Sequence, residues 1–136
     1  MNCSDFLISL KNEFNILGVT DIVIKDKTLI IPIDEEEGMP AYKIAATMIE
    51  EGYLSIYTSF KHNAVLKKEL VELLKVINTF NEQSFLKFIL KKEFIKVEYN
   101  IAELDKEDVL KVIRIISIIP NILFEFYKDL VKYIAK

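Results

Sequence analysis

Two residues carry the side chains used in acid–base and nucleophilic chemistry: His62, the only histidine, and Cys3, the only cysteine. Such catalysis usually needs a base that is held in place by a third group. His62 stands just before a predicted helix, where an exposed or capping histidine is expected, and Cys3 is far from it along the chain. We therefore expect that neither residue is needed for function, and the sequence predicts no catalytic residue and no enzyme activity.

Metal and cofactor motifs are also missing from the sequence. One histidine and one cysteine cannot supply the four nitrogen or sulfur ligands of a structural zinc site. The acidic run Asp34–Glu37, followed by Gly38, lacks the alternate-residue spacing and the distal glutamate of a calcium loop, so it is interpreted as a solvated acidic loop. The three glycines are isolated and form no phosphate-binding loop. The sequence thus predicts no metal ion and no cofactor.

Length and charge narrow the class of protein. The 136 residues fit a single domain spanning 1–136. The net charge is −3, and the basic residues are spread along the chain, with Lys67–Lys68 and Lys91–Lys92 as the nearest approach to clusters. Nucleic-acid binders usually carry a basic patch that neutralises phosphates. We therefore expect no nucleic-acid partner.

The single cysteine and the absence of a visible signal peptide predict a protein of the cytoplasm, which is a reducing compartment. The most apolar segment is interrupted by charged residues, and its uncharged stretch from Ile115 to Phe124 is ten residues long. A membrane-spanning helix needs about twenty residues. The sequence therefore predicts no membrane association.

The elements that position these residues follow from hydrophobic periodicity. Helical spacing predicts a first helix ending at Gly18, a second capped by Asn63 and ending near Asn81, and a third capped by Asp105. Pro120 is expected to bend or restart that last helix. Alternation predicts strands around Ile22–Ile24, Thr28–Ile33, Tyr42–Ile49, Tyr53–Phe60, Leu86–Leu90 and Ile95–Tyr99.

The order of these elements is helix, three or four strands, helix, two strands, helix. It predicts an α+β fold in which an antiparallel sheet joined by hairpins carries its helices on one face. A structure in which residues 42–60 are not extended would contradict this fold class.

One stretch of the chain resembles a known family. The run Leu73–Asn81, with asparagines at 78 and 81, resembles the helix end of the YbjN-type bacterial domains, and Phe85–Leu90 and Ile95–Tyr99 resemble their next two strands. These domains are similar in fold to the chaperones of type III secretion systems, which are small, acidic and dimeric. The resemblance implies a non-enzymatic chaperone-like or regulatory domain, and it carries over no catalytic residue.

Strand alternation also predicts a second, helix-free face of the sheet that is unusually apolar. If Leu54, Ile56 and Phe60 point at the helices, their neighbours point away, and an open face is normally polar. Five residues are expected there: Tyr53, Tyr57, Phe85, Ile89 and Phe94. Exposed apolar patches of this kind mark interfaces, unless another segment of the chain covers them.

Two functions remain open from the sequence. The first is a protein-binding module that engages another protein chain through this face and forms a small acidic homodimer. The second is a small-molecule sensor or enzyme with a pocket between the sheet and the helices, which would show several convergent polar groups. Few polar residues interrupt the apolar faces, which favours the first.

Overall fold

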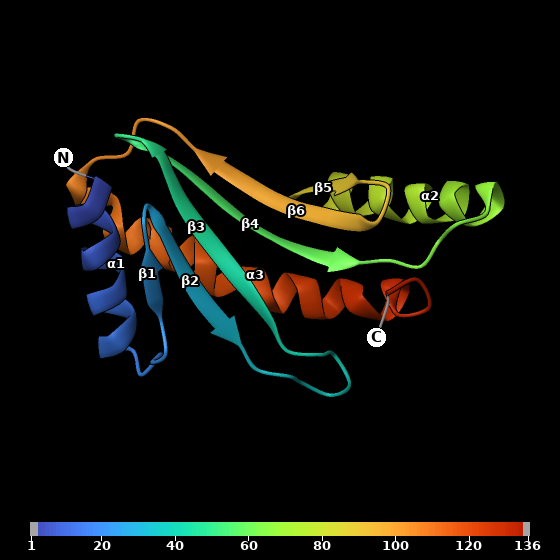
Figure 1. Ribbon diagram of the computed structural model, residues 1–136, viewed down its shortest axis with the longest axis horizontal. Coiled ribbons are helices and arrows are strands. Elements are labelled where there is room, and N and C mark those ends of the chain that lie inside the picture. Colours follow the sequence, from blue (N-terminus) through green and yellow to red (C-terminus); the bar gives the residue numbers. More distant parts are fainter. Residues whose placement is uncertain (1–2, 135–136) are drawn as a thin grey trace.

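The computed structural model describes residues 3–134, and for Cys3 only the backbone. Its elements are α1 (Cys3–Ile16), β1 (Val23–Lys25), β2 (Thr28–Ile33), β3 (Tyr42–Glu50), β4 (Tyr53–Lys61), α2 (Lys67–Gln83), β5 (Lys87–Leu90), β6 (Phe94–Ile101), the 3₁₀ turn η1 (Lys106–Asp108) and α3 (Val109–Leu130). The predicted α+β order is confirmed (Figure 1).

The strands form one antiparallel six-stranded sheet in the order β1-β2-β3-β4-β6-β5. The long hairpin of β3 and β4 turns at Gly52, whose φ of 81° is a left-handed conformation that favours glycine. The Gly52 carbonyl accepts a hydrogen bond from the Leu104 amide at 2.9 Å, and a Cβ at residue 52 would lie 3.4 Å from the Leu104 carbonyl oxygen. This contact ties the hairpin turn to the loop that leads into α3.

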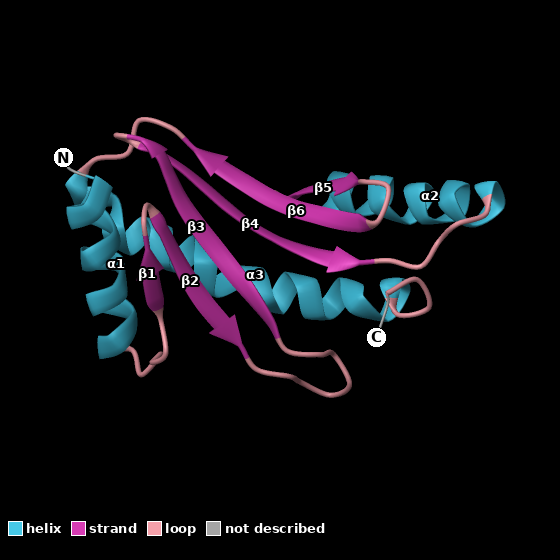
Figure 2. Ribbon diagram, in the orientation of Figure 1, coloured by secondary structure: helices cyan, strands magenta, loops and turns pink. Residues whose placement is uncertain are grey.

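The helices gather on one face of the sheet, and α3 runs behind the strands along most of their length (Figure 2). The residues of β4 that point at the helices are buried, as Leu54 and Ile56 show, and the same holds for Ile95 and Val97 of β6. The opposite face, called here the open face, carries no helix. The predicted placement of the helices on one side is therefore confirmed.

The far end of the core is built on three packed aromatic rings from α2, β5 and α3. Phe80 stacks on Phe126 with ring centroids 4.2 Å apart, and Phe88 packs against both rings at 5.3 and 5.8 Å. Next to them, the Asn81 side chain bonds both backbone groups of Phe88: its Nδ2 donates to the carbonyl at 3.0 Å, and its Oδ1 accepts from the amide at 2.6 Å. Asn81 thus acts as a partner for the outermost strand.

One local expectation is wrong, and of the bend or restart expected at Pro120 the restart does not occur. The second helix begins at Lys67, because β4 and the loop after it extend further than expected, and Asn63 does not cap it. The Oε1 atom of Glu69 instead accepts a hydrogen bond from the Leu66 amide at 3.0 Å. The last helix does not restart at Pro120, since α3 continues through it, and packing of its apolar stripe outweighs the one lost backbone bond.

Candidate functional site

His62 is a buried structural residue. It is 5% exposed, so the expectation of an exposed side chain is wrong. Its Nδ1 accepts a hydrogen bond from the Ala64 amide at 3.2 Å, and its Nε2 lies 2.8 Å from the Lys91 carbonyl oxygen, which it therefore bonds as a donor. The Nε2 bond joins the end of β4 to the β5–β6 turn, and the Nδ1 bond holds the loop that follows β4. The expected capping role is also absent, since α2 begins at Lys67 with Leu66 as its N-cap, and both ring nitrogens are occupied by these two bonds.

The described residues hold neither a cluster of metal ligands nor a membrane-spanning helix. Among these residues, no group of three or more His, Cys, Asp or Glu side chains is placed to hold a metal ion. No helix in the same range is long and apolar enough to cross a bilayer. The side chain of Cys3 lies outside the described part. The site must therefore be sought among surfaces and clefts.

The five residues predicted for the open face do not form one patch. Ile89 pairs in register with Lys96, two residues from Phe94, so Ile89 and Phe94 lie near each other at one end of β5 and β6. Tyr53 and Tyr57 lie on β4, on the same side of that strand. Phe85 packs edge-on against Tyr99 at 5.1 Å, and Tyr99 pairs with the buried Ile56 on the helix side. Phe85 therefore does not join the other four.

Tyr57 is held in a fixed position on the open face. Its hydroxyl lies 3.3 Å from Thr47 Oγ1, which in turn lies 2.9 Å from Thr28 Oγ1, so three strands are linked. The Lys96 Nζ stands over its ring, 5.5 Å from the centroid, and pairs with Glu98 at 3.2 Å. The ring is therefore preorganised, and it also lines a cleft at this side of the sheet.

That cleft exists because the sheet splits in two. The register of β3 with β4 ends at Ala45 and Tyr57. Beyond this point β3 stays paired with β2 as far as Tyr42, and β4 stays paired with β6 as far as Lys61. Figure 1 shows β3 departing with β2 and β4 departing with β6. Two strand edges in the middle of the sheet are therefore left facing each other without pairing.

The hydrogen bonds show which backbone groups face this gap. Antiparallel strands turn the N–H and C=O groups of successive residues to alternate sides. The His62 amide bonds the Glu93 carbonyl on the β6 side, so the amides and carbonyls of Ser59 and Lys61 point to the β3 side. The next bonded pair of the β3–β4 register would be Lys43 with Ser59. In its place, the Thr58 hydroxyl donates to the Lys43 carbonyl at 2.7 Å.

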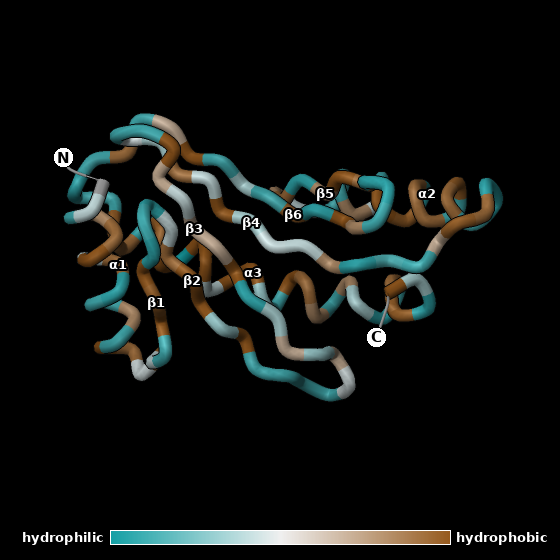
Figure 3. The backbone as a smooth tube through the Cα atoms, viewed as in Figure 1, coloured by the Kyte–Doolittle hydropathy of each residue, from teal (hydrophilic) through white to brown (hydrophobic). Residues whose placement is uncertain are grey.

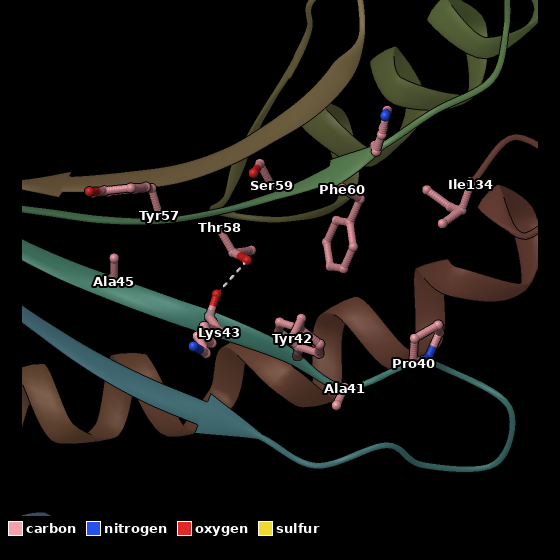
Figure 4. Close-up of a pocket in the computed structure, with 11 residues that line it drawn as sticks. Pro40, Ala41, Tyr42, Lys43, Ala45, Tyr57, Thr58, Ser59, Phe60 and Ile134 are labelled. Carbon is pink, nitrogen blue, oxygen red and sulfur yellow. Dashed lines mark hydrogen bonds between the residues drawn. The ribbon is translucent and has the colours of Figure 1, made fainter. Parts of the chain in front are cut away.

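The gap is a cleft of about 460 Å³, and it is lined by Pro40, Ala41, Tyr42, Lys43 and Ala45 before and on β3, by residues 57–61 of β4, and by Ile134. The rings of Tyr42 and Phe60 meet across it, edge to face, with centroids 5.3 Å apart (Figure 4). They form an aromatic floor, and Lys43 of β3 and Lys61 of β4 also line the cleft. No acidic residue lines this cleft among the described residues.

The Tyr42 hydroxyl is buried beneath the cleft. It is the one buried side-chain polar atom of the described residues for which the structure gives no hydrogen-bond partner. Burial raises the pKa of Tyr42 from 10.0 to about 12, and the nearby Glu36 carboxylate adds to the shift. Both effects favour the neutral phenol.

We expect the folded state to lose stability as the pH rises from about 10 towards 12, because the unfolded chain gives up the Tyr42 proton first. Below pH 10 both states hold the proton, and this contribution is fully present. Tyr42→Phe keeps the ring against Phe60 and removes the titration, so its loss of stability over the same pH range should be smaller. Urea unfolding at a series of pH values measures the difference. Equal losses in the two proteins would contradict the burial of this hydroxyl.

The open face and the cleft are basic, although the chain is acidic overall. Register and alternation place on the open side of the strands five lysines, Lys25, Lys43, Lys61, Lys87 and Lys96, against two glutamates, Glu50 and Glu98. The basic character of the open face was not predicted from the sequence, because the lysines are far apart in the chain. Their outward positions in the strand alternation were the signal that would have found it.

Comparison with known proteins identifies no relative: no family model, no curated protein and no solved structure matches the chain.

Proposed function

We propose that this domain is a non-enzymatic protein-binding module, chaperone-like or regulatory, that holds an acidic polypeptide segment in the cleft of its split sheet. The observation that carries the proposal is the pair of edges inside the sheet that have no strand partner, at Lys43 on β3, whose carbonyl accepts from the Thr58 hydroxyl, and at Ser59 and Lys61 on β4, whose backbone groups face the gap. Exposed strand edges bind extended peptides through backbone hydrogen bonds, and adjacent pockets select side chains.

The chemistry of the cleft favours a carboxylate-bearing segment. The lysine ammonium groups at 43 and 61, the amides of Ser59 and Lys61 and the Ser59 hydroxyl are all donors, whereas a carboxylate is an acceptor. The Tyr42 and Phe60 rings offer an apolar surface to a neighbouring aliphatic or aromatic side chain. A short segment that combines Asp or Glu with an apolar residue would bind both the donor groups and the aromatic rings of the cleft.

Selection from a random peptide library displayed on phage tests this function. We expect enrichment of sequences with Asp or Glu next to an apolar residue, and a shift to basic sequences when Lys43→Glu/Lys61→Glu is the bait. Amide NMR shifts caused by the enriched peptide should centre on Ser59 and Lys61. The charge-matched control Lys68→Glu/Lys75→Glu lies on exposed positions of α2 and should select the same peptides as the wild type. Enrichment without acidic residues, or displacement of the peptide by a single-stranded oligonucleotide, would contradict the proposal.

A second candidate function rests on a pocket of about 480 Å³ between the end of α1, β2 and α3. Thr20, Asp21, Asp34 and Ser117 supply polar groups to its lining. Pro120 lacks the amide that would bond the Ile116 carbonyl, and both residues line this pocket. This set consists mainly of acceptors and fits a small amine. NMR shifts at Thr20 and Ser117 on addition of small amines, with none at Ser59 on addition of peptides, would favour a small-molecule sensor.

A further inference from the structure

The chain carries a segment with the chemistry that the cleft requires. The loop between β2 and β3 contains Asp34, Glu35, Glu36 and Glu37, all of them exposed. The structure gives these four carboxylates no ion pair within the described residues. Four adjacent like charges repel one another, and a cationic partner relieves that repulsion. Lys43 and Lys61 are likewise exposed and have no ion pair in the same part of the chain.

We infer that the acidic loop Asp34–Glu37 of a second copy occupies the cleft, so that the chain is a homodimer in which each loop enters the cleft of its partner. This inference rests on the proposed function and names the segment that the cleft holds. Within one chain the loop leads into Pro40 and Ala41 of the cleft lining, and its Glu36 carboxylate lies near Tyr42 (Figures 1 and 4). In the described part of the chain none of its carboxylates forms an ion pair with Lys43 or Lys61, so both lysines are left for the loop of a second copy. Figure 3 shows hydrophilic stretches in the loop after β2 and at the end of β4, the two surfaces that would meet.

The position of the loop suits a two-fold arrangement. It leads directly into the start of β3, which forms one wall of the cleft, so the loop and the cleft mouth lie at the same end of the molecule. In a two-fold dimer the same patch serves both subunits, and each contact occurs twice. One axis near the start of β3 therefore places both loops in both clefts. Met39 is buried and anchors the base of the loop, which limits the entropy lost on docking.

Two charge-reversed variants test the inference in the full chain. The cleft variant Lys43→Glu/Lys61→Glu has acidic clefts and acidic loops, whereas the loop variant Glu35→Lys/Glu36→Lys has basic clefts and loops of zero net charge that present two lysines to the partner's cleft. By light scattering, the wild type should be a dimer at micromolar concentration, and each variant alone should dissociate about tenfold or more readily. An equimolar mixture of the two variants should recover the dimer mass, because both loop–cleft contacts are then attractive.

Matched controls separate this contact from net charge. Lys68→Glu/Lys75→Glu and Glu72→Lys/Glu82→Lys make the same charge changes at exposed positions of α2 and should leave the dimer unchanged. Raising the salt from about 0.1 to about 1 M shortens the Debye length from ~10 to ~3 Å and should weaken the wild-type dimer. Circular dichroism melts check that every variant folds, and Lys43→Gln/Lys61→Gln serves if charge reversal unfolds the chain.

The inference is overturned if the wild type is a monomer at micromolar concentration, or if folded variants fail to form a dimer when mixed. It is also overturned if both variants form dimers as well as the wild type does. These results are distinct from a failure of the proposed function. If the chain is a monomer but still selects acidic peptides through Ser59 and Lys61, only the homodimer inference is contradicted. If the chain selects no acidic peptide, the proposed function is contradicted as well.

Discussion

Phe88→Ala is expected to lower the free energy of unfolding by about 3–5 kcal/mol, the largest effect of any single change considered for this chain. Phe88 is 3% exposed and contacts the rings of Phe80 and Phe126, so truncation opens a cavity that the stacked rings cannot fill. Urea unfolding of the wild type and the variant measures the loss.

Two substitutions on the open face provide the comparison. Phe94 is 40% exposed, and Tyr57 lies half-buried beneath Lys96, so Phe94→Ala and Tyr57→Ala should each destabilise the fold less than Phe88→Ala does. Truncated anchors of an interface commonly cost about 2 kcal/mol or more of binding, and both variants should therefore weaken binding of a partner or a second copy by about tenfold or more. If both melt as early as Phe88→Ala, these side chains belong to the core and the open face is not a binding surface.

His62→Ala should cost about 2–4 kcal/mol of folding stability, since it leaves the Lys91 carbonyl and the Ala64 amide without their partners and removes a buried ring. The loss is structural: acidic-peptide binding should persist at temperatures where the variant is folded. His62→Gln retains one donor and one acceptor and should recover part of the stability. A variant as stable as the wild type would show that the two hydrogen bonds contribute nothing to the fold.

The order of the elements along the chain and the position of the helices on one face could be predicted because one face of every long strand is apolar. The alternation of Leu54, Ile56 and Phe60 placed β4, and an isolated glycine at 52 marked its turn. The same alternation failed at Phe85, because this residue precedes β5. The Ser84 hydroxyl bonds the Leu86 amide at 2.8 Å there and bends the chain.

The split of the sheet could not be predicted, because a binary pattern of apolar and polar residues does not record which strands remain paired. It depends on contacts between distant residues. The Thr58 hydroxyl donates a hydrogen bond to the Lys43 carbonyl, which would otherwise pair with β4. Just after β4, the Asn63 amide donates to the Tyr133 carbonyl at 2.8 Å and so directs the end of this strand away from β3. The candidate site therefore lies where tertiary contacts override the local pairing of two strands that alternation had placed correctly.

The bond between Asn81 and Phe88 has a consequence for the solubility of the protein. The outer edge strands of a sheet are the usual sites where copies of a protein pair edge to edge and form fibrils. Here one rim is the four-residue β5, whose Phe88 backbone is already occupied by the Asn81 amide, and the other rim is the three-residue β1. Both rim strands are therefore short, and the occupied Phe88 backbone leaves less of one rim on which a fibril could grow, whereas the proposed interior cleft admits one short segment and is then full.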